Sequence, residues 1–301
     1  MKKIIIDEQG EGQRVDKFLA MLMPEISRSK IQSSLKSGTC LVNNQIAKPS
    51  FILKEGMELC FDEIETSSKL EILAEDLGLD IIWEDENMAV INKPSNMLTH
   101  PTMLEQSGTL VNTLLFHYGN NLSDINGEFR RGIVHRLDRN TSGLIMIAKN
   151  NKTHEYLVDE MKAKKFTKKY IAIVKGIVEK DEFIIDKPIG RHQSQPHKQA
   201  IREDGKSAIT IVKVLKRLNN ATLLEMSLIT GRTHQIRVHL SSVGHPVFND
   251  TLYGFGKIKI KTEEQVLQSY KLEFTRPFTD ERICLEIPYD EKVCKVLNAL
   301  S

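Results

Sequence analysis

The pattern of apolar and polar residues predicts a small unit of helices and strands near the start of the chain. Apolar residues recur at helical spacing within residues 14–23 and again within residues 27–37. Residues 40–45 are typical of a strand followed by a tight turn, and residues 54–59 of a turn followed by a strand. We therefore expect a small α/β unit of two amphipathic helices and short strands over residues 12–62.

The rest of the chain shows more strand patterns than helix patterns. Residues 63–78 are polar and acidic, and we expect them to form a linker to a larger domain over residues 79–301. The predicted strands lie at residues 81–83, 88–92, 143–149, 170–178, 209–214 and 222–229, and the predicted helices at residues 109–118, 152–162 and 233–242. Because strands follow strands as often as helices, the pattern favours an α+β domain with a mixed, mainly antiparallel β-sheet over a doubly wound parallel sheet.

Composition places the protein among globular chains that do not enter membranes. Of its 301 residues, 40% are hydrophobic and 27% are charged, so the chain can bury a substantial core. Its apolar runs are far shorter than the roughly 18 residues that a membrane-spanning helix needs, and acidic residues interrupt the N-terminal run before a signal-peptide core forms. We therefore expect a cytoplasmic protein, and a monomer. The isolated cysteines favour reduced thiols over disulfides or a zinc site: Cys40, Cys60, Cys284 and Cys294.

Charge is distributed unevenly, although the net charge is only +2. Residues 1–129 carry 11 basic against 20 acidic residues, residues 130–217 carry 21 against 10, and residues 218–301 carry 10 of each. The middle block therefore has a net charge of +11. A cationic face of this kind suits a polyphosphate such as RNA, because binding releases counterions from the phosphates. The same lysines could instead solvate a helix end and an edge strand, and charge alone does not separate the two interpretations.

The first candidate for chemistry is Asp138, in the stretch His-Arg-Leu-Asp-Arg-Asn-Thr-Ser-Gly at residues 135–143. It is the only acidic residue within residues 129–154, and Arg136 and Arg139 flank it. Neighbouring cations keep a carboxylate ionised, as an aspartate nucleophile or base requires. The same pattern also fits a helix cap or a structural ion pair in a turn.

The second candidate is the stretch Thr-Gly-Arg-Thr-His-Gln-Ile-Arg-Val-His-Leu at residues 230–240. A helix that begins at Thr233 would place His234 and Arg237 on one polar face, beside a glycine turn. His234 and His239 are five residues apart, which is the wrong spacing for two metal ligands on a helix, and no carboxylate or cysteine accompanies them. We therefore expect no metal.

The third candidate is Tyr170, which follows Lys168 and Lys169 at the start of a predicted strand. A tyrosine beside lysines can stack on a nucleobase while the lysines hold phosphate, although a strand tyrosine also commonly packs in a core. Residues 204–207, Asp-Gly-Lys-Ser, lack the earlier glycine of a phosphate-binding loop, and no Gly-x-Gly-x-x-Gly stretch occurs. The sequence therefore predicts no nucleotide cofactor.

These stretches occur, together with Asn92-Lys93-Pro94, in the order found in RluA/RluD-type pseudouridine synthases, which the chain resembles over about residues 80–290. The front of the chain resembles the S4 RNA-binding domain through its Ser-Arg-Ser-Lys, Leu-Val-Asn-Asn and Lys-Glu-Gly-Met-Glu-Leu stretches. The resemblance implies a mixed, largely antiparallel catalytic sheet that isomerises uridine to pseudouridine in structured RNA without a cofactor. The expected substrate is large-subunit (23S) ribosomal RNA.

The resemblance also implies roles for single residues. Asp138 is expected to be the catalytic nucleophile or base, with Arg237 against it and Arg232 as the alternative partner. Tyr170 is expected to stack on the uracil, and Arg136 to fill the gap left when the uridine flips out of its stack. The other residues expected to contact RNA are Arg139, Lys168, Lys169, Arg232 and His234 in the catalytic domain and Arg28, Lys30, Lys36 and Lys48 in the S4-like unit.

Two other functions fit parts of the sequence. A catalytically inactive, RNA-binding ribosome-assembly factor would keep the S4-like unit and the basic block without the reaction. A glycoside hydrolase also uses a carboxylate at an anomeric carbon, but such enzymes usually need two, and the stretches around Asp138 and Arg237 supply one. The presence of Asp138, Tyr170 and Arg237 together favours the synthase.

Overall fold

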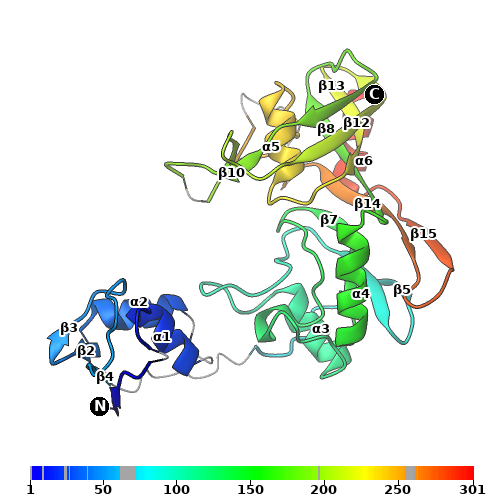
Figure 1. Ribbon diagram of the computed structural model, residues 1–301. Coiled ribbons are helices and arrows are strands. Elements are labelled where there is room, and N and C mark those ends of the chain that lie inside the picture. Colours follow the sequence, from blue (N-terminus) through cyan, green and yellow to red (C-terminus); the bar gives the residue numbers. More distant parts are fainter. Residues whose placement is uncertain are drawn as a thin grey trace. The chain divides into compact units, whose positions relative to one another are not determined.

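A computed structural model of the chain divides into two compact units, residues 1–71 and 72–301 (Figure 1). The residues that the structure describes are 2–8, 10–23, 26, 28–38, 40–61, 72–195, 197–254, 260, 262 and 264–301. Most of the expected linker, residues 63–71, lies outside them. The domain boundaries given above therefore stay predictions, and each unit is described by itself.

The smaller unit contains the two expected helices and a four-stranded antiparallel sheet of order β1-β4-β2-β3. Its elements are β1 (Lys2–Ile5), α1 (Val15–Leu22), α2 (Arg28–Lys36), β2 (Cys40–Val42), β3 (Gln45–Ile46) and β4 (Glu58–Phe61). Phe18 and Leu19 of α1 and Ile31 and Leu35 of α2 are buried in one core, which confirms the amphipathic spacing seen in the sequence. Strand β1 was not predicted.

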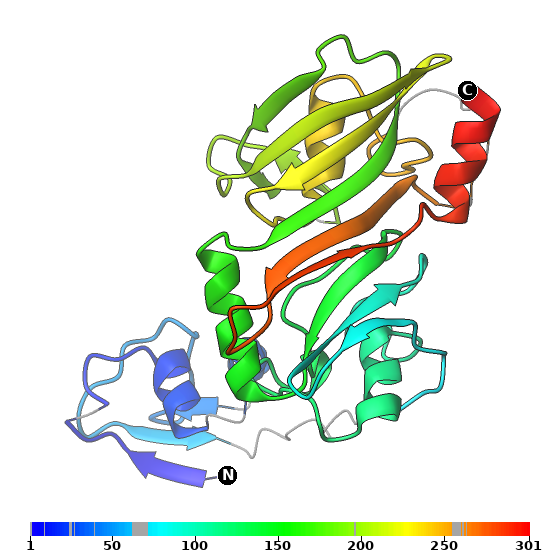
Figure 2. The same cartoon turned by 90° about the vertical axis from the view of Figure 1, so that its right-hand side faces the viewer.

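The larger unit is built on a nine-stranded, mainly antiparallel sheet, as the sequence predicts (Figure 2). Its strands are β5 (Ile81–Glu84), β6 (Met88–Lys93), β7 (Ser142–Ala148), β8 (Thr167–Lys175), β9 (Glu182–Asp186), β12 (Ile209–Leu218), β13 (Ala221–Leu228), β14 (Leu267–Thr275) and β15 (Arg282–Glu286). Their order is β5-β6-β7-β14-β8-β13-β12-β9, and β15 pairs with β14. Among the pairings of the described strands in this sheet, only β14 with β7 is parallel. The late strand β14 thus joins the two halves of the sheet.

Helices cover both faces of this sheet. They are α3 (Leu110–Tyr118), α4 (Asn151–Lys162), α5 (Gln235–Ser242) and α6 (Glu291–Leu300), with a 3₁₀ turn at Glu128–Arg130 and a separate hairpin of β10 (Ile189–Arg191) and β11 (Gln199–Ile201). Side chains alternate between the faces of a strand. Ala172 and Val174 of β8 accordingly share a core with α3 and α5, whereas Ile171 and Ile173 share one with α4 and α6. No helix in the described ranges has the length and apolar character needed to cross a membrane.

The start of α5 corrects one prediction. The helix begins at Gln235, not at Thr233, because His234 has left-handed backbone angles, φ 56° and ψ 19°. A left-handed residue cannot continue a right-handed helix, and histidine adopts this conformation more readily than most residues do. His234 therefore caps the helix, and its side chain does not follow the helical spacing on which the expected polar face rested.

Gly143 allows β7 to run against β14, and we expect Gly143→Ala to destabilise the protein strongly. Its φ is +109°, and an added Cβ would lie 2.0 Å from the carbonyl oxygen of Ser269. Alanine at an incompatible positive φ alone costs more than about 1 kcal/mol, and the backbone clash adds to that cost. Urea unfolding should show a lower midpoint than for Gly231→Ala, because a Cβ at Gly231 meets nothing within 4 Å. Equal midpoints for the two variants would contradict this packing.

We expect two of the four cysteine thiols to react quickly in the native protein. Cys284 and Cys294 are exposed, whereas Cys40 and Cys60 are buried. Burial also raises the pKa of the Cys40 thiol to about 11, so little thiolate forms at neutral pH. A chromogenic disulfide reagent should count two fast thiols in the native protein and four in urea. Four fast thiols without urea would contradict the packing of the smaller unit.

Candidate active site

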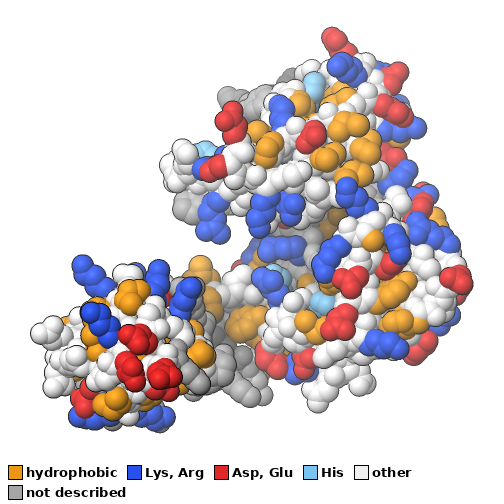
Figure 3. Space-filling view, viewed as in Figure 1, with side chains coloured by type: hydrophobic (Ala, Val, Ile, Leu, Met, Phe, Trp, Pro, Cys, Tyr) orange, Lys and Arg blue, Asp and Glu red, His pale blue; other side chains and the backbone are white. Residues whose placement is uncertain are grey.

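A cleft of about 530 Å³ lies in the larger unit and contains the candidate catalytic residues. Its walls come from residues 134–138, from the first half of β8 and from residues 228–237. Figure 3 shows Lys and Arg side chains on both sides of the hollow between the upper and lower parts of this unit. The basic residues that line the cleft are Arg136, Lys162, Lys164, Lys168, Arg232 and Arg237. Asp138 is the only acidic residue among the described lining residues, so one carboxylate faces a cationic space.

Asp138 faces two side chains from the segment around the start of α5. Arg237 Nη1 donates to Asp138 Oδ2 at 3.3 Å, and His234 Nε2 lies 4.0 Å from the same oxygen. The Asp138 side chain keeps 16% of its surface exposed, so it can meet a ligand in the cleft. The structure therefore brings together Asp138 and Arg237, which are 99 residues apart in sequence.

A second carboxylate fixes the arginine. Arg237 donates from Nε and Nη2 to the two carboxylate oxygens of Asp250, at 2.7 and 2.9 Å, in a bidentate ion pair. Asp250 is buried and also accepts the backbone N–H groups of Leu252 and Tyr253 at 2.9 and 3.0 Å. Burial by itself would raise the pKa of the Asp250 carboxyl, but the hydrogen bonds and charge of Arg237, together with the two backbone N–H groups, outweigh it and lower that pKa. Asp250 therefore stays ionised and orients Arg237 toward Asp138.

Side chains from distant segments donate hydrogen bonds to the backbone carbonyls on either side of Asp138. Thr99 Oγ1 donates to the carbonyl of Leu137 at 2.8 Å. Lys93 Nζ donates to the carbonyl of Arg139 at 3.1 Å, and also to those of Pro94 and Met97. Burial is the main reason that the pKa of the Lys93 ammonium falls to about 7. These contacts tie the segment after Asp138 to the end of β6.

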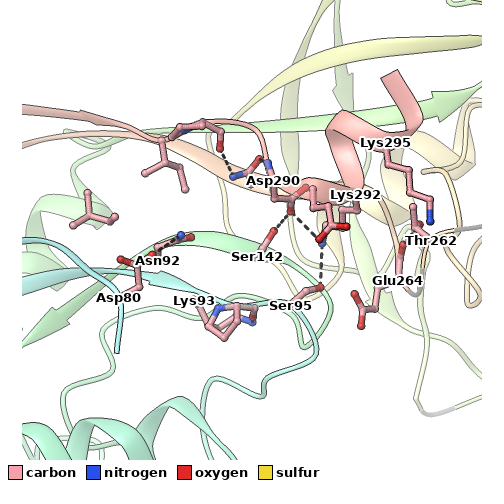
Figure 4. A pocket seen from close by; sticks show the side chains of 16 residues that line it. Asp80, Asn92, Lys93, Ser95, Ser142, Thr262, Glu264, Asp290, Lys292 and Lys295 are labelled. Carbon is pink, nitrogen blue, oxygen red and sulfur yellow. Dashed lines mark hydrogen bonds and ion pairs between the residues drawn. The ribbon is translucent and has the colours of Figure 1, made fainter. Parts of the chain in front are cut away.

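A second pocket, of about 630 Å³, is lined by the end of β6, by Ser142 and by the start of α6 (Figure 4). Its contacts show how α6 supports the loop that follows Asp138, residues 139–141. Lys292 Nζ donates to the carbonyl of Asn140 at 3.0 Å and to Ser95 Oγ at 3.1 Å. Ser142 Oγ donates to Asp290, whose other carboxylate oxygen caps α6 through the N–H of Val293. The C-terminal helix thus contributes to the position of the catalytic loop.

Alternate side chains at the start of β8 point into the cleft. Tyr170 lines the cleft and is only 6% exposed, and burial raises the pKa of its hydroxyl to about 12. Lys168 lies on the same face, and burial lowers the pKa of its ammonium to about 8. Lys169 does not line the cleft, because it points to the opposite face and pairs with Glu225 at 2.9 Å.

The remaining predicted residues lie in three places. Arg136 is exposed at the cleft, and Arg139 forms an ion pair with Glu105. Arg232 also lines the cleft, but its Nε donates to the carbonyl of Ser207 at 2.9 Å, so the structure does not bring it to Asp138. The predicted RNA contacts of the smaller unit are Lys36 and Lys48, which are exposed, Lys30, which is half-buried, and Arg28, whose side chain lies outside the described part.

Several residues of this site were missed by the reasoning from sequence. Asp250, Tyr253 and Lys292 carry no local signal, since each acts through a contact with a distant segment. Lys93 belongs to the Asn-Lys-Pro stretch that contributes to the family resemblance, and a lysine at the end of an apolar run, directly before a proline, was the available sign. In the described residues, no three His, Cys, Asp or Glu side chains gather in a way that could hold a metal ion.

Comparison with known proteins identifies the family. The family model for RNA pseudouridylate synthase matches residues 87–242, and the S4 domain model matches residues 13–59. The chain is 40% identical to YlyB of Bacillus subtilis (strain 168), named an uncharacterized RNA pseudouridine synthase, over 99% of this chain and 97% of that protein. It is 38% identical to ribosomal large subunit pseudouridine synthase D of Pseudomonas aeruginosa, over 96% of this chain and 92% of that protein.

Solved structures agree on the fold. Human RNA pseudouridylate synthase domain containing 1 superposes with a TM-score of 0.60 at 23% identity, over 73% of this chain and 88% of that one. Human RNA pseudouridylate synthase domain containing 4 gives a TM-score of 0.57 at 21% identity, over 74% and 94%. The chain therefore belongs to the RNA pseudouridylate synthase family and carries an N-terminal S4 domain. Its enzyme class is that of the isomerases which form pseudouridine in RNA.

Proposed function

We propose that this protein isomerises specific uridines of large-subunit (23S) ribosomal RNA, and that Asp138 performs the chemistry. The observation that carries the proposal is the ion pair of Asp138 with Arg237 at 3.3 Å, inside a cleft whose other charged lining residues are basic within the described residues. The ion pair orients the carboxylate within the cleft, and the surrounding cations bind the RNA backbone.

The reaction balances without a cofactor. The bond between N1 of uracil and C1′ of ribose breaks, the ring turns, and a bond between C5 and C1′ forms. The hydrogen on C5 leaves as a proton, and N1 gains a proton, so no atom is oxidised and no water is consumed. Asp138 serves as the nucleophile or the base in these steps, a role for which a partly exposed carboxylate is suited.

The target uridine reaches Asp138 by flipping out of its helix or loop. Such flipping lets an enzyme act on a base that stacking otherwise hides. Tyr170 of β8 lines the same cleft as Asp138 and stacks on the uracil. Arg136 is exposed at the cleft edge and fills the place that the uridine leaves.

The substrate assignment rests on the relatives and on the charge. Synthase D of Pseudomonas aeruginosa is named for the large ribosomal subunit, and it matches almost the whole chain. The S4 domain supports RNA binding, with Lys30, Lys36 and Lys48 as contacts together with Arg28. Arg139, Lys168 and Arg232 are the further contacts we propose in the catalytic unit, whereas Lys169 pairs with Glu225 on the face opposite the cleft and His234 faces Asp138. Ribosomal RNA as the substrate is consistent with a monomer that works in the cytoplasm.

An inactive assembly factor is the alternative, and the intact site argues against it. A protein that only binds RNA has no need for an arginine oriented by a buried carboxylate toward a second, accessible one. Asp250 does not make the site a glycosidase pair, because it is fully buried and already accepts four N–H groups.

The test is to map pseudouridine in the 23S ribosomal RNA of cells that lack the gene. Carbodiimide adducts, which stop reverse transcriptase at pseudouridine, should disappear at one or a few positions. The wild-type gene should restore them, and Asp138→Asn should not, although the variant protein accumulates to the same level. An unchanged map would refute the proposed substrate, and restoration by the asparagine variant would refute the role of Asp138.

A further inference from the structure

His234 lies where it can act on the catalytic carboxylate. It precedes α5, and its left-handed backbone directs the ring into the cleft next to Asp138. Its Nδ1 lies 2.7 Å from the hydroxyl oxygen of Tyr253, and the two rings meet edge to face with centroids 5.5 Å apart. Its Nε2 lies 4.0 Å from Asp138 Oδ2. The imidazole therefore bridges a tyrosine hydroxyl and the carboxylate.

The hydrogen bonds of Tyr253 favour one of the two neutral tautomers of His234. The Tyr253 hydroxyl oxygen accepts the backbone N–H of Gln199 at 2.8 Å. The hydroxyl then donates its own hydrogen to the lone pair of His234 Nδ1. In a neutral imidazole the remaining hydrogen lies on Nε2, the nitrogen that faces Asp138.

The surroundings keep this imidazole neutral. Burial is the main cause of a lowered pKa at His234. Of the charges that face it, Asp138 and Asp250 raise this pKa, whereas Arg237 and Arg136 lower it. The net direction is downward, so at neutral pH His234 carries one hydrogen and donates it toward the carboxylate.

The two side chains that face the Asp138 carboxylate lie on the same side of it. Arg237 Nη1 and His234 Nε2 both lie near Oδ2, at 3.3 and 4.0 Å. No hydrogen bond to Oδ1 is found within the described part of the chain. The protein thus contacts the carboxylate through Oδ2, and Oδ1 is the oxygen that can contact the nucleotide.

We propose that Tyr253 and His234 are positioning residues that, with Arg237, hold Asp138 by Oδ2 and present Oδ1 to the target nucleotide. The proposal rests on the proposed function of Asp138. In free enzymes such hydrogen bonds are often long and shorten when the substrate binds. The 4.0 Å separation therefore closes to a hydrogen bond when the nucleotide displaces water from the cleft.

Two substitutions at His234 distinguish the loss of its proposed hydrogen bond to Asp138 from a loss of protein stability. Gln can place an amide N–H near the position of Nε2, whereas the shorter Asn places its amide near that of Nδ1. We expect His234→Gln to keep kcat within about threefold of wild type and His234→Asn to lower it about tenfold, the effect of one hydrogen bond, with KM for RNA unchanged in both. The left-handed backbone favours Asn, so urea unfolding should rank Asn at least as stable as Gln. Activity and stability should thus rank the variants in opposite orders.

Tyr253→Phe tests whether the tyrosine acts through the histidine. It removes the hydroxyl and keeps the ring, which lies 5.0 Å from the Arg237 guanidinium carbon. We expect kcat to fall by about threefold to tenfold in the wild-type background and to change less than twofold in the His234→Gln background. Equal losses in both backgrounds, or equal kcat for His234→Gln and His234→Asn, would overturn the proposal. Failure of the wild-type enzyme to modify any ribosomal RNA would instead refute the proposed function, so the two failures are distinct.

Discussion

Replacing Asp138 with asparagine is expected to abolish pseudouridine formation and to leave RNA binding within about twofold of wild type. An amide can neither attack the nucleotide nor accept its proton, so the rate should fall by a factor of about 10⁴ or more, as on loss of other essential catalytic groups. Binding should survive because the basic residues of the cleft are unchanged. The fold should survive as well, because Asp250 holds Arg237 independently of Asp138.

Single-turnover assays and filter binding on one RNA fragment separate these effects. Asp181→Asn is a matched control, since it makes the same change at an exposed carboxylate that pairs with Arg217 outside the cleft. The control should keep the wild-type rate. An Asp138→Asn protein that turns over at more than about a hundredth of the wild-type rate would remove Asp138 from the mechanism.

Arg237→Met should lose both activity and stability. The substitution leaves the Asp250 carboxylate buried without its cationic partner, which costs roughly 3–5 kcal/mol. It also leaves Asp138 without the donor that holds Oδ2. The double variant Arg237→Met with Asp250→Asn removes the unpaired buried charge and keeps an oxygen to accept the N–H groups of Leu252 and Tyr253.

The two variants distinguish a structural from a catalytic loss. Urea unfolding should show that the double variant recovers at least half of the stability lost by Arg237→Met. Pseudouridine formation should stay absent in both. Recovery of activity together with stability would mean that Arg237 acts only through the fold, and a double variant no more stable than Arg237→Met would contradict the buried ion pair.

The sequence predicted the kind of fold and the centre of the site because these depend on local patterns. The apolar run of β8 and the helical spacing along α3 and α4 are visible in single segments. The residues Asp138, Tyr170 and Arg237 stood out through the resemblance of their stretches to one family. Their meeting in one cleft needed the sheet, in which β14 lies between β7 and β8 although it comes near the end of the chain.

The support around the site was not predictable, because it is made of contacts between distant segments. The bonds from Lys93 and Lys292 to the Asp138 loop span 46 and 152 residues. The pairing of Arg237 with Asp250 spans only 13, yet it depends on the turn after α5. Helical spacing placed His234 on a helix, whereas its left-handed backbone sets the direction of its ring.

The most direct measurement is tritium release from ribosomal RNA labelled at C5 of uridine, because bond formation at C5 expels that hydrogen. The RNA should be large-subunit RNA from cells that lack this gene, with small-subunit RNA from the same cells as the control. We predict release from the large-subunit RNA by the wild-type protein, a yield of one or a few tritium atoms per molecule, and none with Asp138→Asn. Absence of release with the wild-type protein, from both the free RNA and assembling large subunits, would contradict the assigned function.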